Sequence, residues 1–259
     1  MVAAILSPSM QGWMNMDGNG MDRRVFVGNG AATLLLAGLP MYMSACATAR
    51  RYEVTDDGTP IPLAVGDEWL YLESNGYNRE PLADVRYVVD RVAPPRLRIE
   101  VDGKPLSGLR SGQFEEYATP WAVVRDTVYD LENRYESPLP LLPGQLEPGV
   151  RESWQSRVSS DPKEAPRRWN VQIDALGFER VSVPAGEFDA LRIRRLIKFE
   201  HPDFFRSQSE RTEQLWYAPQ VRRWVKREWT GQYMPKLRSR HPLLREDWIV
   251  WELKSFATG

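Results

Sequence analysis

The sequence predicts an all-β fold: a single curled antiparallel sheet (half-barrel) of about ten strands, preceded by a helical signal segment. Two segments, Trp169 to Asp174 and Leu191 to Glu200, alternate apolar and polar side chains, as strands with one wet face do. No stretch after Cys46 keeps the spacing of a long amphipathic helix. Turn signals separate the apolar runs, which favours a meander that curls around its apolar face.

Strands are expected wherever an aromatic, aliphatic or alternating run lies between turn signals. In chain order these runs are Trp69 to Leu72, Val85 to Val92, Leu97 to Val101, Gln113 to Ala118, Trp121 to Tyr129, Ser153 to Val158, Trp169 to Asp174, Leu191 to Glu200, Thr212 to Tyr217, Arg223 to Trp229 and Asp247 to Phe256. The segment Pro138 to Pro148 carries four prolines, and we expect it to be a long surface loop within one domain.

The chain is expected to divide into a leader and signal peptide (1–45), a lipidated tether (46–65) and a half-barrel domain (66–259). The only cysteine, Cys46, follows Ser44 and Ala45 at the end of an uncharged stretch. This pattern resembles a bacterial lipoprotein signal, in which the cysteine is acylated and the chain is cleaved between Ala45 and Cys46. A buried or incidental cysteine is the alternative. Acylation would leave no thiol for a disulfide or a thiolate metal site.

An export motif precedes the uncharged stretch. Arg23, Arg24 and Phe26 resemble the twin-arginine signal, although Asp22 and Gly28 depart from its usual residues. A Sec signal with a basic amino-terminal region remains open, as does a permanent transmembrane helix, because the uncharged span is close to the roughly 20 residues that a bilayer requires.

Residues 1–20 fit no region of a signal peptide. Met16 and Met21 are alternative start positions, so the sequence leaves open whether residues 1–20 are translated. Both the leader and the signal are therefore excluded from the fold prediction.

Composition indicates a packed domain without a global electrostatic field. Hydrophobic residues make up 42% of the chain and aromatic residues 11%, which is enough for a core. The 34 basic and 35 acidic residues give a net charge of −1, and no basic block stands out. We therefore expect no nucleic-acid partner.

Three motifs carry a resemblance to a known family. They are Val183-Pro184-Ala185-Gly186 with Phe188, then Trp216-Tyr217-Ala218-Pro219, and then Val225-Lys226-Arg227-Glu228. The chain resembles a family of bacterial periplasmic domains of unknown function in these positions. The resemblance implies a half-barrel related in shape to carriers that ferry lipoproteins between membranes, and it implies no catalytic residue. Arg222 and Arg223 stand where the family often has a glycine turn.

The search for catalytic chemistry gives little. His201 and His241 each precede a proline, and a metal site would require them to converge with a carboxylate such as Asp203. The serines lack a Gly-x-Ser-x-Gly elbow, and Glu115 and Glu116 lie on opposite sides of a strand. We expect no catalytic residue, no metal and no cofactor. A hydrolase with carboxylates from distant strands remains the less favoured alternative.

Arg195 breaks the alternation of its strand. It shares a face with Ile193 and Ile197, where an unpaired guanidinium would be costly to bury. A bulge or an edge position that turns Arg195 outward is one interpretation. The other is a buried cation that pairs with a carboxylate or with an anionic ligand head group.

Eight tryptophans fall on predicted strands, and most are expected to be core. Some are expected to line a concave apolar groove, for which Trp216 and Trp248 are the candidates together with Arg195.

The resulting functional hypothesis is a lipid-anchored envelope protein without catalysis. It would face the periplasm and bind a lipid-like ligand or an apolar segment of an envelope protein on its concave sheet. The residue after Cys46, Ala47 rather than aspartate, favours the outer over the inner membrane. The alternative is a packed accessory subunit of an envelope complex, which a filled interior would favour.

Overall fold

The computed structural model describes residues 62–103, 113–127, 132–161, 163–236 and 243–259. The predicted signal helix and the residues Arg23, Arg24, Phe26, Ala45 and Cys46 lie outside this part of the chain. Within it, no helix is both long and apolar enough to cross a membrane.

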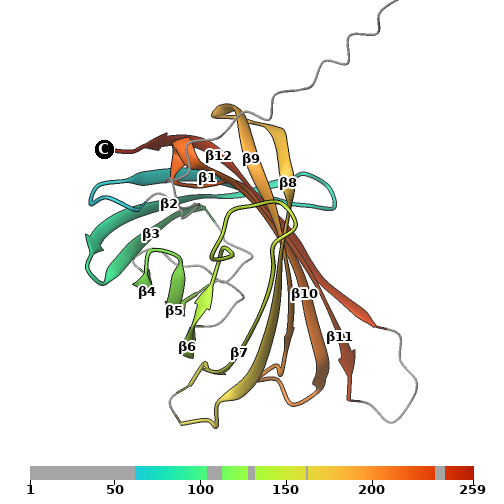
Figure 1. Ribbon diagram of the computed structural model, residues 1–259. Coiled ribbons are helices and arrows are strands. Elements are labelled where there is room, and N and C mark those ends of the chain that lie inside the picture. Colours follow the sequence, from blue (N-terminus) through green and yellow to red (C-terminus); the bar gives the residue numbers. More distant parts are fainter. Residues whose placement is uncertain (1–61, 104–112, 128–131, 162, 237–242) are drawn as a thin grey trace, which may run out of the picture. The chain divides into compact units, whose positions relative to one another are not determined.

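In the described part of the chain, twelve strands form one sheet (Figure 1). Their bounds are β1 (Glu68–Asn75), β2 (Pro81–Val92), β3 (Pro95–Gly103), β4 (Gln113–Thr119), β5 (Ala122–Asp126), β6 (Asn133–Pro140), β7 (Arg151–Ser159), β8 (Arg167–Val183), β9 (Gly186–Phe199), β10 (Arg206–Ala218), β11 (Arg223–Pro235) and β12 (Leu244–Ala257). A single 3-10 turn, η1 (Pro219–Val221), links β10 to β11. The all-β antiparallel prediction is therefore confirmed.

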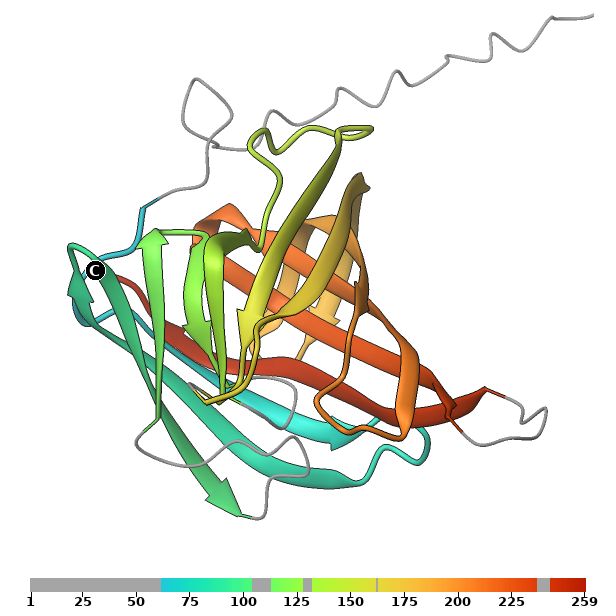
Figure 2. The same ribbon diagram turned by 90° about the horizontal axis from the view of Figure 1, so that it is seen from below.

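The sheet is closed, so the prediction of an open half-barrel is wrong. Every strand pairs antiparallel with its neighbour in sequence, and β1 pairs with β12 from Glu68↔Ala257 to Asn75↔Ile249. Figure 2 shows the strands surrounding a common interior. Closure satisfies the backbone groups that two free edges would expose.

The prediction of about ten strands was too low. The missed strand is β6, which lies in a segment of low apolar content and ends at Pro140, inside the stretch read as a loop. Its side chains Asn133, Tyr135 and Leu139 are buried, and their alternation is interrupted by exposed polar residues and Pro138. The pairing of β6 with β7 is short, with only Arg134↔Ser159 and Tyr135↔Val158 in register.

At two of the motifs singled out from sequence, the chain turns at a residue with a positive φ angle. Val183 pairs with Gly186 across the two-residue turn Pro184–Ala185, and Gly186 has φ +132°, which L side chains rarely adopt. Phe188 then packs on Phe256, with ring centroids 6.0 Å apart. After η1, Arg222 takes φ +56° and its N–H donates to Pro219 O at 2.9 Å. Arg222 thus adopts the left-handed conformation that glycine takes more readily than other residues.

The barrel interior is aromatic at its centre. Trp69, Tyr71, Tyr87, Trp224 and Trp251 are fully buried there. Tyr71 stacks on Trp224 and on Trp251 with centroids 6.4 and 6.0 Å apart. Since no part of these rings is exposed, no water-sized space adjoins them, and the barrel is filled at this level.

Candidate functional site: a buried arginine cluster inside the barrel

Arg195 points into the barrel and is fully buried. The alternation of β9 places it on the inward face with Ile193 and Ile197, without a bulge at that position. It forms an ion pair with Glu213, its direct neighbour on β10. Of the two interpretations that the sequence left open for Arg195, the structure therefore has the second, a buried cation paired with a carboxylate.

Glu213 forms ion pairs with two arginines. Its other carboxylate oxygen accepts from Nε of Arg227 on β11, and both residues are buried. We call Arg195, Glu213 and Arg227 the buried triad. Two guanidinium groups share one carboxylate, so the triad carries a net charge of +1 away from water, which is costly without further partners.

Aromatic rings supply some of those partners. The guanidinium of Arg227 lies 5.1 Å from the ring centroid of Trp224, 5.5 Å from that of Trp229 and 5.6 Å from that of Trp251. A cation over an aromatic face is attracted by the ring quadrupole, by about 2 kcal/mol where both are desolvated. Arg195 has no such contact in the described part of the chain, and its Nε and Nη2 have no hydrogen-bond partner there.

A third buried arginine lies close to the triad. Arg223, at the start of β11, is fully buried, and its Cζ is 3.8 Å from the Trp224 centroid and 4.4 Å from that of Tyr87. Its Nη2 is 3.5 Å from Oε2 of Glu115 on β4. The same carboxylate accepts from the hydroxyls of Tyr87 at 3.0 Å and Tyr117 at 2.5 Å. Arg223 and Glu115 thus form a pair whose remaining faces are covered by rings and phenols.

The phenols around Glu115 stay protonated at neutral pH. Burial raises the pKa of Tyr87 and Tyr117 well above the ordinary value, and the charge of Glu115 raises both further. Each hydroxyl can therefore act as a permanent donor to the carboxylate.

Asp126, at the end of β5, has a different electrostatic environment. Its carboxylate is buried and accepts from Asn133 Nδ2 at 3.1 Å and from the Tyr135 hydroxyl at 3.0 Å. Burial raises its pKa to about 7, with a further contribution from the charge of Glu115. Asp126 therefore changes its charge near neutral pH.

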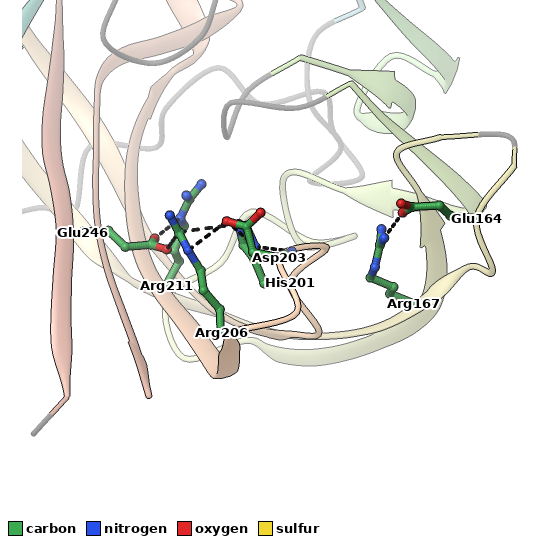
Figure 3. A network of polar contacts seen from close by, with 7 residues as sticks. All are labelled: Glu164, Arg167, His201, Asp203, Arg206, Arg211 and Glu246. Atoms are coloured by element: carbon green, nitrogen blue, oxygen red, sulfur yellow. Dashed lines mark hydrogen bonds and ion pairs between the residues drawn. The ribbon is translucent and has the colours of Figure 1, made fainter. Parts of the chain in front are cut away.

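A second polar network lies beyond the end of β9 (Figure 3). Arg206 binds Asp203 (Nε–Oδ2 3.2 Å) and Glu246 (Nη1–Oε1 2.8 Å), and Arg211 binds the other oxygen of Glu246 at 3.0 Å. His201 accepts from the Asp203 backbone N–H at its Nδ1. Burial, assisted by the charge of Arg206, lowers the pKa of His201 to about 4, so this ring is neutral at pH 7.

His201 and Asp203 do lie close together, with Nδ1 3.6 Å from Oδ2. His241 lies outside the described residues. Among those that are described, no group of three histidine, cysteine or acidic side chains is placed to hold a metal ion.

The three residues proposed from sequence as a ligand site do not share one. Trp216 lies on the opposite face of β10 from Leu215 and Tyr217, and its indole N–H donates to Glu179. The guanidinium of Arg192 and the ammonium of Lys226 lie over its ring, 5.5 and 5.0 Å from the centroid.

Trp248 is also outward, opposite Thr230 in the register of β11 and β12. It stands perpendicular to Tyr77, with centroids 5.6 Å apart, in an outer groove of about 450 Å³ that Thr212 and Arg245 also line. The expected concave groove shared by Arg195, Trp216 and Trp248 is therefore wrong, because Arg195 alone of the three faces the interior.

Sequence reasoning missed the residues that bind Arg195. Glu213 shares its parity on β10 with Leu215 and Tyr217, and Arg227 shares its parity on β11 with Trp229. A search for charged residues at inward positions of several strands would have found both. Arg223, Glu115 and Asp126 gave no such signal, because their strands are short or begin at a bulge.

Comparison with known proteins adds little. No protein-family model and no curated protein matches the chain. A "putative lipoprotein" of Parabacteroides distasonis is 14% identical, with a TM-score of 0.46. A "putative exported protein with YmcC-like fold" of Bacteroides fragilis is 12% identical, with a TM-score of 0.39. Each match covers 78% of this chain and 100% of the other. Neither likeness is strong enough to carry an argument about function.

The buried triad makes an ordered prediction about stability. Glu213→Gln should lower the free energy of unfolding by about 3–5 kcal/mol, because it removes the charge of the carboxylate that Arg195 and Arg227 share. Arg195→Met should cost less, because Glu213 keeps Arg227 as its partner. Urea unfolding followed by tryptophan fluorescence measures both variants. A loss for Arg195→Met that equals or exceeds that for Glu213→Gln would contradict the shared-carboxylate interpretation.

Asp126 makes a prediction about pH. Its folded-state pKa of about 7 lies above the usual value of a free aspartate, so the folded protein binds the proton more tightly than the unfolded chain. The resulting stability is fully present below pH ~4 and is lost as pH rises towards 7, by up to about 1.4 kcal/mol per pH unit. Asp126→Asn should remove this component. Parallel stability curves for the two proteins between pH 4 and 7 would refute it.

Proposed function

We propose that the chain is a lipid-anchored envelope protein that acts by binding rather than by catalysis. Its barrel serves as a packed accessory module that presents its outer surface to an envelope partner. The observation that supports this most is the filled interior, in which Trp69, Tyr71, Trp224 and Trp251 are fully buried together with Arg223.

A filled interior favours this function over ligand transport inside the barrel. An acyl chain entering at the level of Tyr71 would have to displace stacked rings and separate Arg223 from Glu115. Breaking a buried ion pair costs several kcal/mol, which binding would have to supply. The charged side chains are also engaged with one another and with rings, so they resemble a structural core more than a catalytic site.

A lipid-like ligand or an apolar partner segment remains the second candidate, at a different place. The outer groove beside Trp248 and Tyr77 combines two aromatic rings with Thr212, Thr230 and Arg245. The two rings give this groove apolar contacts, and its other lining residues, which include Glu210 and Gln232, offer hydrogen-bonding groups.

Anchoring rests on the amino-terminal sequence. Cys46, preceded by Ser44 and Ala45, is proposed to carry the lipid after cleavage, with Arg23 and Arg24 directing export. The barrel would then face the periplasm, from the outer membrane by preference.

One comparison tests both parts of this proposal. Wild-type protein should fractionate with membranes and carry a covalent lipid by mass spectrometry, whereas Cys46→Ser should appear in the soluble fraction without that mass. Neither form should release a stoichiometric non-covalent lipid, and cross-linking of the wild type in cells should give one defined partner band. Retention of Cys46→Ser in membranes with unchanged lipid mass would refute the anchor. A stoichiometric released lipid without a partner band would favour the ligand hypothesis.

A further inference from the structure

Large apolar side chains are exposed together at one end of the barrel. Phe204 is 85% exposed, in the connection that follows β9. Four more exposed apolar residues belong to the adjoining ends of the β9–β10 connection, β11 and β12. We call this set the apolar tip; it consists of Phe204, Phe205, Met234, Leu243 and Leu244.

Hydrogen bonds and strand register bring these residues to one place. The backbone N–H of Lys236 donates to Phe205 O at 2.6 Å, and the Ser207 hydroxyl donates to Met234 O at 2.8 Å. Leu244 is opposite Tyr233 in the pairing of β12 with β11. The tip therefore spans three adjacent strands at the end where β9 passes into β10, at the bottom of Figure 1.

Ion pairs of Arg206 hold the loop that carries the two phenylalanines of the tip. Arg206, directly after Phe205, is bound to Asp203 on one side of the phenylalanines and to Glu246 on β12 (Figure 3). Its guanidinium also lies 4.6 Å from the Tyr233 ring centroid. This clamp fixes a short loop with Phe204 at its apex, although burying that ring within the protein would be favourable. Exposed apolar groups on a braced loop indicate a surface built for contact.

Positive charge surrounds the tip. Within the described part of the chain, Arg168, Lys236 and Arg245 have no ion-pair partner, and Arg168 lines the same hollow as Leu243. The carboxylates of Asp203 and Glu246 are bound to Arg206 and Arg211, whereas those of Glu200 and Asp247 form no ion pair among the described residues. Among these residues, the uncompensated charge at this end is therefore positive, by one charge.

We propose that the apolar tip is a membrane-contacting surface, which inserts Phe204 and its apolar neighbours into the interface of an anionic phospholipid bilayer. Aromatic and aliphatic side chains with flanking lysine and arginine are the combination that binds such an interface. A bilayer accepts a protruding loop without a shaped pocket, whereas a protein partner would need a cavity for Phe204.

The tip would also orient a lipid-anchored barrel on the bilayer. Ser182, near the Gly186 turn, is at the far end of β9 from Phe204, about 45 Å away for a strand of this length. Contact at the tip would therefore orient the barrel with the β8–β9 turn away from the bilayer. The orientation of an anchored barrel rests on the proposed lipid anchor, whereas the contact of the tip with the bilayer does not.

A local fluorescence measurement tests the contact. The full chain with Cys46→Ser has no thiol, so Phe204→Cys supplies the only labelling position for a polarity-sensitive dye. With vesicles of phosphatidylcholine and phosphatidylglycerol we expect a blue shift of emission and quenching by nitroxide-labelled lipids. The matched control, Ser182→Cys, should show neither. Lys236→Glu with Arg245→Glu should reduce the shift at position 204 and remove its dependence on anionic lipid.

Three outcomes would overturn the proposal. They are an unchanged emission at position 204 when the protein is bound to vesicles, an equal change at positions 182 and 204, and a change that requires an added envelope protein fraction. The last would indicate a protein partner. Because Cys46 is absent throughout, these outcomes are independent of whether the wild type is lipidated.

Discussion

The pairing of β1 with β12 is the constraint on which the rest of the structure depends. It joins strands about 180 residues apart in sequence, from Glu68↔Ala257 to Asn75↔Ile249, and it closes an otherwise local meander. Without it the sheet would have two free edges and one open face. With it, every inward residue of twelve strands shares one interior, so the charges on that face must find partners there.

The interior meets this requirement with a small set of ion pairs embedded in aromatic rings. The buried triad links β9, β10 and β11 side by side, and Arg223 reaches across to Glu115 on β4. A shift of one residue in any of these strands would move its charge to the outer face and leave a partner buried alone. These contacts therefore specify register, whatever their net effect on stability. The same packing is why the proposed function lies on the outer surface and at the barrel ends.

The alternation of apolar and polar side chains predicted strands best where the strands are long and regular. β8 and β9 were identified from their period of two. The same period put Arg195 on the face of Ile193 and Ile197, but the sequence left open a bulge or an edge position that would turn it outward. β6 was missed, since its prolines and polar residues hide the few inward side chains. Closure was missed because no local pattern records a pairing between the first and last strands.

The candidate site was only partly predictable for a related reason. Trp216 and Trp248 were judged by residue type, as large rings able to line a concave apolar groove. Whether each ring faces the interior or the outside of the barrel depends on its position in the strand register. The cross-strand partners of Trp216 are Arg192 and Lys226, which lie on the outer face. The partners of Arg195 lie on other strands, so their relation to it depends on register, which sequence alone does not supply.

Disulfide trapping across the β1–β12 seam tests the closed barrel most directly. Leu72 and Glu252 are register partners on these strands, and paired strand positions lie within the Cα separation that a disulfide spans. In the Cys46→Ser chain, Leu72→Cys with Glu252→Cys should cross-link on mild oxidation as fully as a reference pair on β9 and β10, Arg194→Cys with Gln214→Cys. Cross-linking of the reference pair alone would mean that the seam is open and the sheet a half-barrel.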